Sequence, residues 1–204
     1  MSDNRVFVTS IAAAVLAIGA AALIYTQSTG RALAADDGPG PNLVIQVAGQ
    51  ANGKIVIDLL PDIAPKSVAQ IVAIAKSGAY NGVVFHRVLD GFMAQTGDVK
   101  YGKKGGDMRL AGTGGSDLPN IPAEFSDRSF QRGIVGMARS NDPDSANSQF
   151  FIMFAPGEFL NGKYAVVGHV IEGMEVVDKI KKGSVDLNGA VEDPDVMTSV
   201  TVEK

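Results

Sequence analysis

Residues 85–98 read FHRVLDGFMAQTGD and place one cation, one amide and two bulky apolar side chains within strand-like sequence. A second segment, NSQFFIM at residues 147–153, again sets an amide beside phenylalanines. Together the two segments predict a shallow apolar site with a few hydrogen-bond donors. Neither segment contains an obvious nucleophile, metal cluster or phosphate-binding loop.

The composition is typical of a globular chain. The 204 residues suggest one domain with additional segments, and 46% of them are apolar. The 18 basic and 22 acidic residues leave a net charge of −4, which argues against a nucleic-acid partner because such partners need a basic face. There is no cysteine, so disulfides, thiolate catalysis and cysteine-based zinc sites are excluded.

The first 34 residues have the pattern of a targeting segment. Residues 11–25 read IAAAVLAIGAAALIY, an apolar helical sequence, and no charged residue occurs from Val6 to Gly30. The small residues at 32 and 34 resemble a signal-peptidase site, which predicts cleavage after Ala34. The apolar stretch is also nearly long enough to span a bilayer, so an uncleaved anchor formed by residues 6–25 is the alternative. Residues 35–41, ADDGPGP, then form a flexible linker.

The remaining chain, residues 42–204, predicts a mainly β domain. Strand-like runs occur at Leu43–Val47, Lys54–Leu60, Val83–Leu89, Phe92–Thr96, Gly133–Ala138, Phe150–Phe154, Ala165–Val170 and Val196–Val202. Helices are expected from Pro65 to the glycine at 78 and from Met174 to Lys182. The glycine-rich stretch Gly97–Glu124 is too long for an ordinary connection, which predicts a functional or packed loop. These elements fit a closed eight-stranded antiparallel β-barrel capped by two α-helices.

Strand alternation predicts the direction of Arg87. It places Phe85, Arg87 and Leu89 on one face and Val84, His86 and Val88 on the other. If the second face lines the core, Arg87 points outward beside Phe85, and His86 is a buried, hydrogen-bonded histidine. Two interpretations of Arg87 remain at this point. It is either a solvated charge among scattered apolar residues or a guanidinium at the rim of an apolar pocket.

These segments resemble the cyclophilin family of peptidyl-prolyl isomerases. FHRVLDGFMAQTGD, GTGG at 112–115, GIVGMAR at 133–139, NSQFFIM and EFLNGKYAVVGHVIEGMEVVDKI occur in that family's order and at near-family spacing. The likeness covers about Leu43 to Val202, and the combination of FHR…GFM.Q.GD with SQFFI is far more specific than a lone short motif. The short chain and the export-type segment favour the bacterial exported type.

The resemblance implies a peptidyl-prolyl cis–trans isomerase that accelerates folding of exported proteins. An X–Pro amide resists rotation by about 18–20 kcal/mol because its nitrogen donates electrons into the carbonyl. In the family an arginine donates to the prolyl nitrogen as it pyramidalises, and Arg87 occupies that position. Gln95 matches the residue that orients this arginine and the substrate carbonyl. The resemblance implies no cofactor and no metal.

The resemblance also implies a set of substrate-binding residues. They are Phe92, Met93, Ala138, Arg139, Gln149, Phe151, Phe159, Leu160 and Tyr164. Three of these positions depart from the family: Arg139 stands where Asn is frequent, Phe159 where many members have Trp, and Tyr164 where His is frequent. Phenylalanine lacks the indole N–H donor. We therefore expect weak binding of cyclosporin, the family's inhibitor, with activity largely kept.

The expected partners are proline-containing polypeptides that are unfolded or partly folded. No nucleic acid is expected, and the membrane is contacted only through the N-terminal segment. The expected location is the bacterial cell envelope, in the periplasm, either released after cleavage near Ala34 or anchored in the inner membrane by residues 6–25. The alternative function is a catalytically weak chaperone module that binds proline-containing peptides. Arg87 favours the enzyme, because a pure binder has no requirement for a cation over the prolyl nitrogen.

Overall fold

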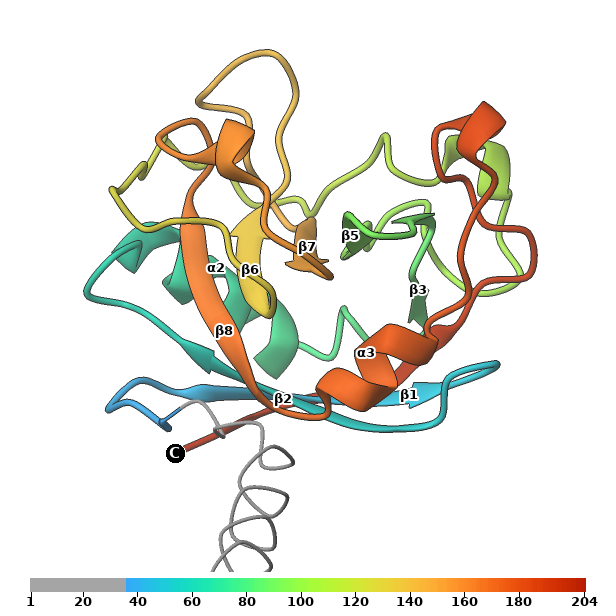
Figure 1. Ribbon diagram of the computed structural model, residues 1–204, viewed down its shortest axis with the longest axis horizontal. Coiled ribbons are helices and arrows are strands. Elements are labelled where there is room, and N and C mark those ends of the chain that lie inside the picture. The colour runs from blue at the N-terminus through green and yellow to red at the C-terminus, as the bar shows by residue number, and fades with distance from the viewer. Residues whose placement is uncertain (1–35) are drawn as a thin grey trace, which may run out of the picture. The chain divides into compact units, whose positions relative to one another are not determined.

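The domain is built on one curled antiparallel sheet, shown by a computed structural model that describes residues 36–204 (Figure 1). Its strands are β1 (Asn42–Ala48), β2 (Gly53–Leu59), β3 (Val83–Val84), β4 (Arg87–Leu89), β5 (Met93–Thr96), β6 (Ile134–Met137), β7 (Phe150–Met153), β8 (Val166–Glu172) and β9 (Val196–Glu203). The strand order in this nine-stranded sheet is β3-β9-β1-β2-β8-β6-β7-β5-β4. The helices are α2 (Pro65–Lys76) and α3 (Met174–Lys179), with 3-10 helices η1 (Met108–Leu110), η2 (Glu158–Leu160) and η3 (Val185–Leu187).

The prediction of a closed eight-stranded barrel differs from this sheet. The single strand expected at Val83–Leu89 is two strands, because β3 pairs with β9 while β4 pairs with β5. β3 and β4 are the first and last strands in the strand order. Phe85 and His86 connect these two strands, which are not hydrogen-bonded to each other in the sheet. The backbone N–H of Phe85 donates to the carbonyl of Asp195 (2.9 Å), and its side chain is fully buried. Phe85 therefore lies in the core and not beside Arg87 on the outer face, which corrects that part of the alternation prediction.

Loops cover the two outer edges of the sheet. Along β4, the N–H of Val88 donates to the carbonyl of Gly189 (2.8 Å), and the N–H of Gly183 donates to the carbonyl of Val88 (2.9 Å). Along β3, the N–H of Val84 donates to the carbonyl of Gly102 (2.8 Å). Such pairing satisfies backbone groups that an open edge would expose. At β4 it also brings the loop 183–191 beside Arg87.

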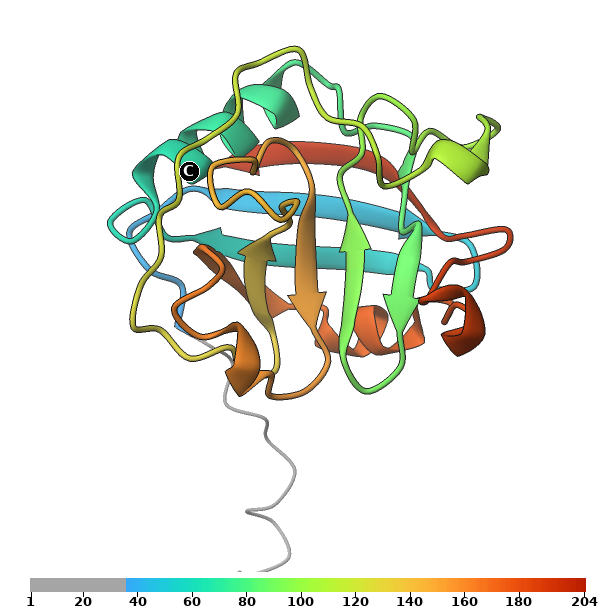
Figure 2. The ribbon, with the colours of Figure 1, turned by 90° about the horizontal axis from the view of Figure 1, so that it is seen from above.

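The main hydrophobic core lies inside the curl, and α2 and α3 both pack against it, at opposite ends of the curl (Figure 2). The apolar spacing Val68, Ile71, Val72 and Ala75 predicts the buried face of α2: Val68, Ile71 and Ala75 are buried in this core and Val72 is partly buried against it, while Ile74 is buried as well. Helix α3 is shorter than predicted, because it ends at Lys179 rather than Lys182. Ile180 leaves the helix with an extended backbone (ψ 130°) and is fully buried. Burial of the Ile180 side chain therefore favours this early end, and the helix does not continue to Lys182 as the sequence indicated.

The long connection Gly97–Glu124, predicted to be a functional or packed loop, is only partly buried, and hydrogen bonds to two carboxylates organise it. Buried Asp98 accepts hydrogen bonds from the N–H groups of Gly112 (2.8 Å) and Gly114 (2.9 Å). Glu124 accepts from the N–H and the hydroxyl of Ser67 (2.8 and 2.7 Å) in the first turn of α2, where the helix has no side-chain cap of its own. Because Asp98 holds both glycines, their carbonyl groups have fixed positions next to β5.

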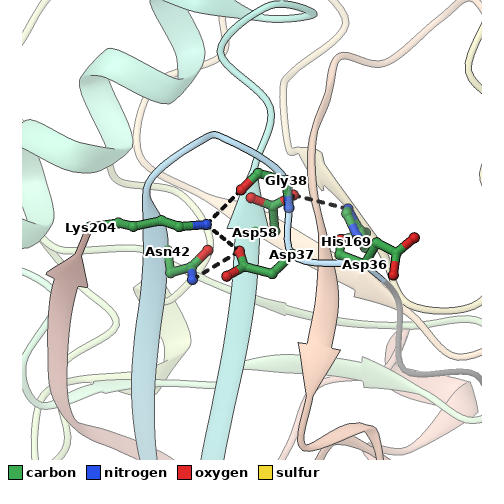
Figure 3. Close-up of polar contacts among 7 residues, drawn as sticks. All are labelled: Asp36, Asp37, Gly38, Asn42, Asp58, His169 and Lys204. Carbon is green, nitrogen blue, oxygen red and sulfur yellow. Dashed lines mark hydrogen bonds and ion pairs between the residues drawn. The ribbon is translucent and has the colours of Figure 1, made fainter.

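Residues 36–41, the described part of the segment 35–41 that was expected as a linker, contact the ends of β1 and β2 (Figure 3). The Asp37 carboxylate accepts hydrogen bonds from the Asn42 amide (3.2 Å) and from the Lys204 ammonium (2.7 Å). The N–H of Gly38 donates to the buried carboxylate of Asp58 (3.1 Å). The predicted signal or anchor lies outside the described residues. Within residues 36–204 the structure has no helix with the length and apolarity needed to cross a bilayer.

Candidate active site

The outer face of β5, β6 and β7 carries a second apolar cluster. Along β7, Phe150 and Ile152 enter the main core, as the alternation of side chains in a strand requires, whereas Phe151 and Met153 point to the second cluster. Its buried members are Met93, Phe130, Phe151, Met153, Leu160 and Val166. The rings of Phe130 and Phe151 stack with their centroids 5.7 Å apart. Strand alternation therefore places an apolar platform on the outside of the curl.

A pocket of about 250 Å³ opens on this platform. Its lining consists of Arg87, Phe92, Met93, Gln95, Ala138, Arg139, Phe151, Phe159, Leu160 and Tyr164. All ten are among the eleven site residues expected from the resemblance. The eleventh, Gln149, lines an adjacent hollow of about 190 Å³ that shares Gln95, Ala138 and Arg139 with the pocket. The structure thus brings together every expected site residue, from segments far apart in the chain.

Arg87 is half-buried at the rim of the pocket, and three hydrogen bonds to oxygen hold its guanidinium. Nη1 donates to Oε1 of Gln95 (3.2 Å), Nε donates to the carbonyl oxygen of Asn188 (3.0 Å), and Nη2 donates to Oδ1 of Asn188 (3.0 Å). Burial lowers the pKa of Arg87, but a guanidinium stays protonated across the physiological range. None of the ion pairs found within residues 36–204 involves Arg87. Its positive charge is therefore directed at the pocket without a carboxylate behind it.

Asn188 was missed by the sequence analysis. It follows η3 in the left-handed conformation (φ 53°), and the pairing of its loop with β4 brings it to Arg87. The sequence contains one weak signal, the pair Asn188-Gly189, which is typical of a turn. Nothing local connects that turn to Arg87, because 101 positions separate the two residues.

A chain of amide hydrogen bonds continues from Arg87 into the neighbouring hollow. Nε2 of Gln95 donates to Oε1 of Gln149 (2.9 Å). Nε2 of Gln149 in turn donates to the carbonyl groups of Gly112 (3.0 Å) and Gly114 (2.7 Å), whose own N–H groups are held by Asp98. This chain fixes which end of each amide is the oxygen, because every donor meets an acceptor. Gln95 consequently presents its oxygen to Arg87.

The three positions that depart from the family lie on the rim of the pocket. The guanidinium carbon of Arg139 lies 4.5 Å from the ring centroid of Tyr164, and Nε and Nη2 of Arg139 donate to the Lys163 carbonyl (3.0 and 2.9 Å). Arg139 therefore folds back onto the protein. Phe159 is 62% exposed and packs against Phe92 with ring centroids 5.4 Å apart.

The backbone of Ala138 has one group already in use. Its N–H donates to the Gln149 carbonyl (2.9 Å). If substrate backbone pairs at this position, as the resemblance implies, it pairs through the Ala138 carbonyl.

His86 is buried, as expected, but it is not hydrogen-bonded in the expected way. Both ring nitrogens are without a hydrogen-bond partner among the described residues. The ring lies under Gly112, where a Cβ would come within 3.1 Å of it. Burial lowers the pKa of His86, so the neutral ring is favoured. A neutral imidazole beneath the loop does not compete with Arg87 as a cation.

Comparison with protein families agrees with this geometry. Residues 43–202 match the model described as cyclophilin type peptidyl-prolyl cis-trans isomerase/CLD. A probable peptidyl-prolyl cis-trans isomerase of Brucella suis is 61% identical over 154 residues, which cover 74% of this chain and 79% of the relative. Peptidyl-prolyl cis-trans isomerase 10 of Caenorhabditis elegans is 38% identical over 135 residues, 66% of this chain and 80% of the relative.

Solved structures have the same fold. The cyclophilin AquaCyp293 from Hirschia baltica has a TM-score of 0.63 at 27% sequence identity and covers 78% of this chain and 73% of its own. A cyclophilin type peptidyl-prolyl cis-trans isomerase of Cryptosporidium parvum, determined in the presence of the dipeptide Ala-Pro, has a TM-score of 0.66 at 23% identity. It covers 80% of this chain and 99% of its own, and at that identity it supports the fold.

Proposed function

This chain belongs to the cyclophilin-type peptidyl-prolyl cis–trans isomerase family, and from that premise we propose that Arg87 is the group that accelerates X–Pro rotation. One observation carries the proposal. The guanidinium of Arg87 stands at the rim of an apolar pocket, and none of the ion pairs within residues 36–204 offsets its charge. The proline ring of a substrate occupies that pocket, and its imide nitrogen lies next to Arg87.

The chemistry follows from the electronic structure of the amide. Rotation about the X–Pro bond breaks the conjugation between nitrogen and carbonyl, so a lone pair develops on the nitrogen. A guanidinium carries five N–H donors, and three of those on Arg87 donate to protein oxygens. Nη1 also contacts the sulfur of Met93 weakly (3.9 Å), so the remaining N–H of Nη2, or that of Nη1 once it leaves the sulfur, donates to the developing lone pair. This interaction is stronger in the twisted state than in either planar isomer, which is the condition for catalysis.

The walls of the pocket supply binding and orientation. Met93, Phe151 and Leu160 are almost fully buried beneath the pocket, so they offer a preformed apolar floor. Burying the ring of proline on that floor is favourable by about 25 cal/mol for each Å² of apolar surface removed from water. The pocket therefore selects proline by shape, while Arg87 acts on the bond.

A protease-coupled isomerisation assay on an Ala-Pro-Phe peptide tests this proposal. We expect the wild type to accelerate isomerisation and Arg87→Ala to lower kcat/KM by about two orders of magnitude, the usual cost of removing a preorganised electrostatic donor. Arg128→Ala is the matched control, because Arg128 is exposed and does not line the pocket. Equal rates in wild type and Arg87→Ala would contradict the enzymatic role of Arg87. Binding of the peptide without acceleration would favour the chaperone alternative.

We also propose that the substrates are exported polypeptides and that the enzyme works in the bacterial cell envelope. The support is the apolar segment before Ala34 in the sequence. Uncatalysed X–Pro isomerisation takes tens to hundreds of seconds, which is slow enough to limit the folding of such clients. Mass spectrometry of the protein purified from its native host distinguishes the two forms. A new N-terminus at Ala35 means cleavage, and a start at Met1 or Ser2 in the membrane fraction means anchoring.

A further inference from the structure

We propose that Asn188 is a positioning residue for Arg87, and that it acts as an uncharged acceptor so that the guanidinium keeps its positive charge. This inference rests on the catalytic role proposed for Arg87. Asn188 lies outside the lining of the pocket, so its effect on the substrate passes through Arg87.

The geometry of the contact restricts rotation of the guanidinium. The carbonyl oxygen and Oδ1 of Asn188 accept from Nε and Nη2 of Arg87, both at 3.0 Å. Gln95 accepts from Nη1 on the other side of the same planar group. A fork held along two edges cannot turn about its last side-chain bonds without breaking a charge-assisted hydrogen bond. The orientation of the N–H groups that remain is thereby fixed before a substrate arrives.

The position of Asn188 is itself fixed by the fold. Its φ of 53° lies in the left-handed region, which asparagine tolerates better than most residues. The next residue, Gly189, donates its N–H to the Ser184 carbonyl (2.7 Å) and accepts from the N–H of Val88 (2.8 Å). Asn188 is therefore clamped between a tight turn and β4, although its side chain is exposed.

The charge of the acceptor is the second part of the inference. Aspartate has nearly the same shape as asparagine and offers the same acceptors, but its negative charge would compensate the guanidinium at hydrogen-bond distance. A guanidinium whose positive charge is offset by a neighbouring carboxylate donates a weaker hydrogen bond to a neutral lone pair. Asp186, two positions earlier in the same loop, is exposed and forms no ion pair with Arg87. The loop thus presents an amide, and not its nearby carboxylate, to the catalytic cation.

Three variants separate orientation from charge. Asn188→Gly keeps the left-handed backbone and the carbonyl but removes Oδ1. Asn188→Asp keeps both acceptors but adds the charge. Val185→Asp is the control, because Val185 is 76% exposed on the same loop and is not in contact with Arg87 through any hydrogen bond found in residues 36–204. Exchange NMR on an Ala-Pro-Phe peptide measures turnover and affinity together, and the Arg87 Nε–H signal reports whether the guanidinium is held.

We expect Asn188→Gly to lower kcat about tenfold while peptide affinity changes less than about threefold, because the pocket floor is untouched. Asn188→Asp is expected to lower kcat by a similar factor although the Arg87 Nε–H signal persists. Val185→Asp should stay within about twofold of wild type. Wild-type turnover in either folded Asn188 variant would overturn the inference. An inactive wild-type chain would contradict the proposed function itself, so the two failures are distinguishable.

Discussion

The guanidinium of Arg139 covers the ring of Tyr164, with 4.5 Å between the guanidinium carbon and the ring centroid. Tyr164 also meets Phe151 on the pocket floor edge to face, with ring centroids 5.9 Å apart. Two positions that depart from the family therefore contact each other. In the sequence they are two separate changes, 25 positions apart, whereas in the structure they form a pair on the pocket wall.

This pairing predicts an energetic coupling between the two residues. Arg139→Gln and Tyr164→Leu each remove one partner, and the double variant closes the cycle. We expect a coupling of about 0.5–1 kcal/mol in the free energy of unfolding, the range for an exposed cation–π contact. Tyr164→Phe should keep the coupling because the ring remains. Additive single effects in chemical denaturation would show that the contact contributes nothing.

The exposed Phe159 predicts how the protein responds to cyclosporin. Phe159 packs against Phe92 at the rim but has no N–H donor for the ligand. We expect Phe159→Trp to tighten cyclosporin binding by about tenfold, which corresponds to one added hydrogen bond, while kcat/KM for a short peptide changes less than twofold. Isothermal titration calorimetry measures the first quantity. A nanomolar dissociation constant for the unmodified chain would contradict the prediction.

His86 predicts a pH dependence of stability. Burial lowers its pKa in the folded state, so the unfolded chain takes up this proton first as the pH falls. Stability linked to His86 is therefore complete above the unfolded pKa of about 6.5 and decreases as the pH falls below it. The slope is at most about 1.4 kcal/mol per pH unit for one proton. Urea unfolding between pH 5 and 8 should show this decrease in wild type and a smaller one in His86→Leu; parallel curves would contradict it.

Glu124 caps the start of helix α2 from a distant position in the sequence, which predicts a contribution to stability. Its carboxylate accepts from the N–H and hydroxyl of Ser67 in a helix that lacks its own cap. Glu124→Ala should lower the free energy of unfolding by about 1–2 kcal/mol, as loss of an N-cap does. Exposed Glu192 supplies the control substitution Glu192→Ala. Thermal unfolding of both variants measures the difference, and equal melting temperatures would show that the cap is not stabilising.

The elements that sequence reasoning found best are those with local patterns. The helix at Pro65 and the alternation of Phe150 with Phe151 could be predicted because a periodic apolar pattern reports directly which face is buried. The strand predicted at Val83–Leu89 was wrong at Phe85, because a bend that changes strand partners leaves no periodic signal. The early end of α3 depends on burial of Ile180 and on a bond from the Lys181 N–H to Asp195 (2.7 Å), which is a tertiary contact.

The candidate site shows the same difference between what local motifs reveal and what depends on tertiary contacts. The resemblance named the eleven residues around the two hollows, since their motifs are contiguous. It could not reveal Asn188, whose contact with Arg87 depends on a loop that covers an edge strand. It also could not show that Arg139 folds onto Tyr164. Such relationships arise from packing between distant segments, and no single segment encodes them.

The central claim is that the fork-shaped guanidinium of Arg87 acts on the imide nitrogen, and Arg87→Lys tests it most directly. Lysine keeps the positive charge but replaces the planar fork by a flexible point charge. Two-dimensional exchange NMR on the Ala-Pro-Phe peptide, at equal bound fraction, gives the rate of isomerisation on the enzyme. We predict that Arg87→Lys binds the peptide but isomerises it about a hundredfold more slowly than wild type. A wild-type rate in Arg87→Lys would contradict the account.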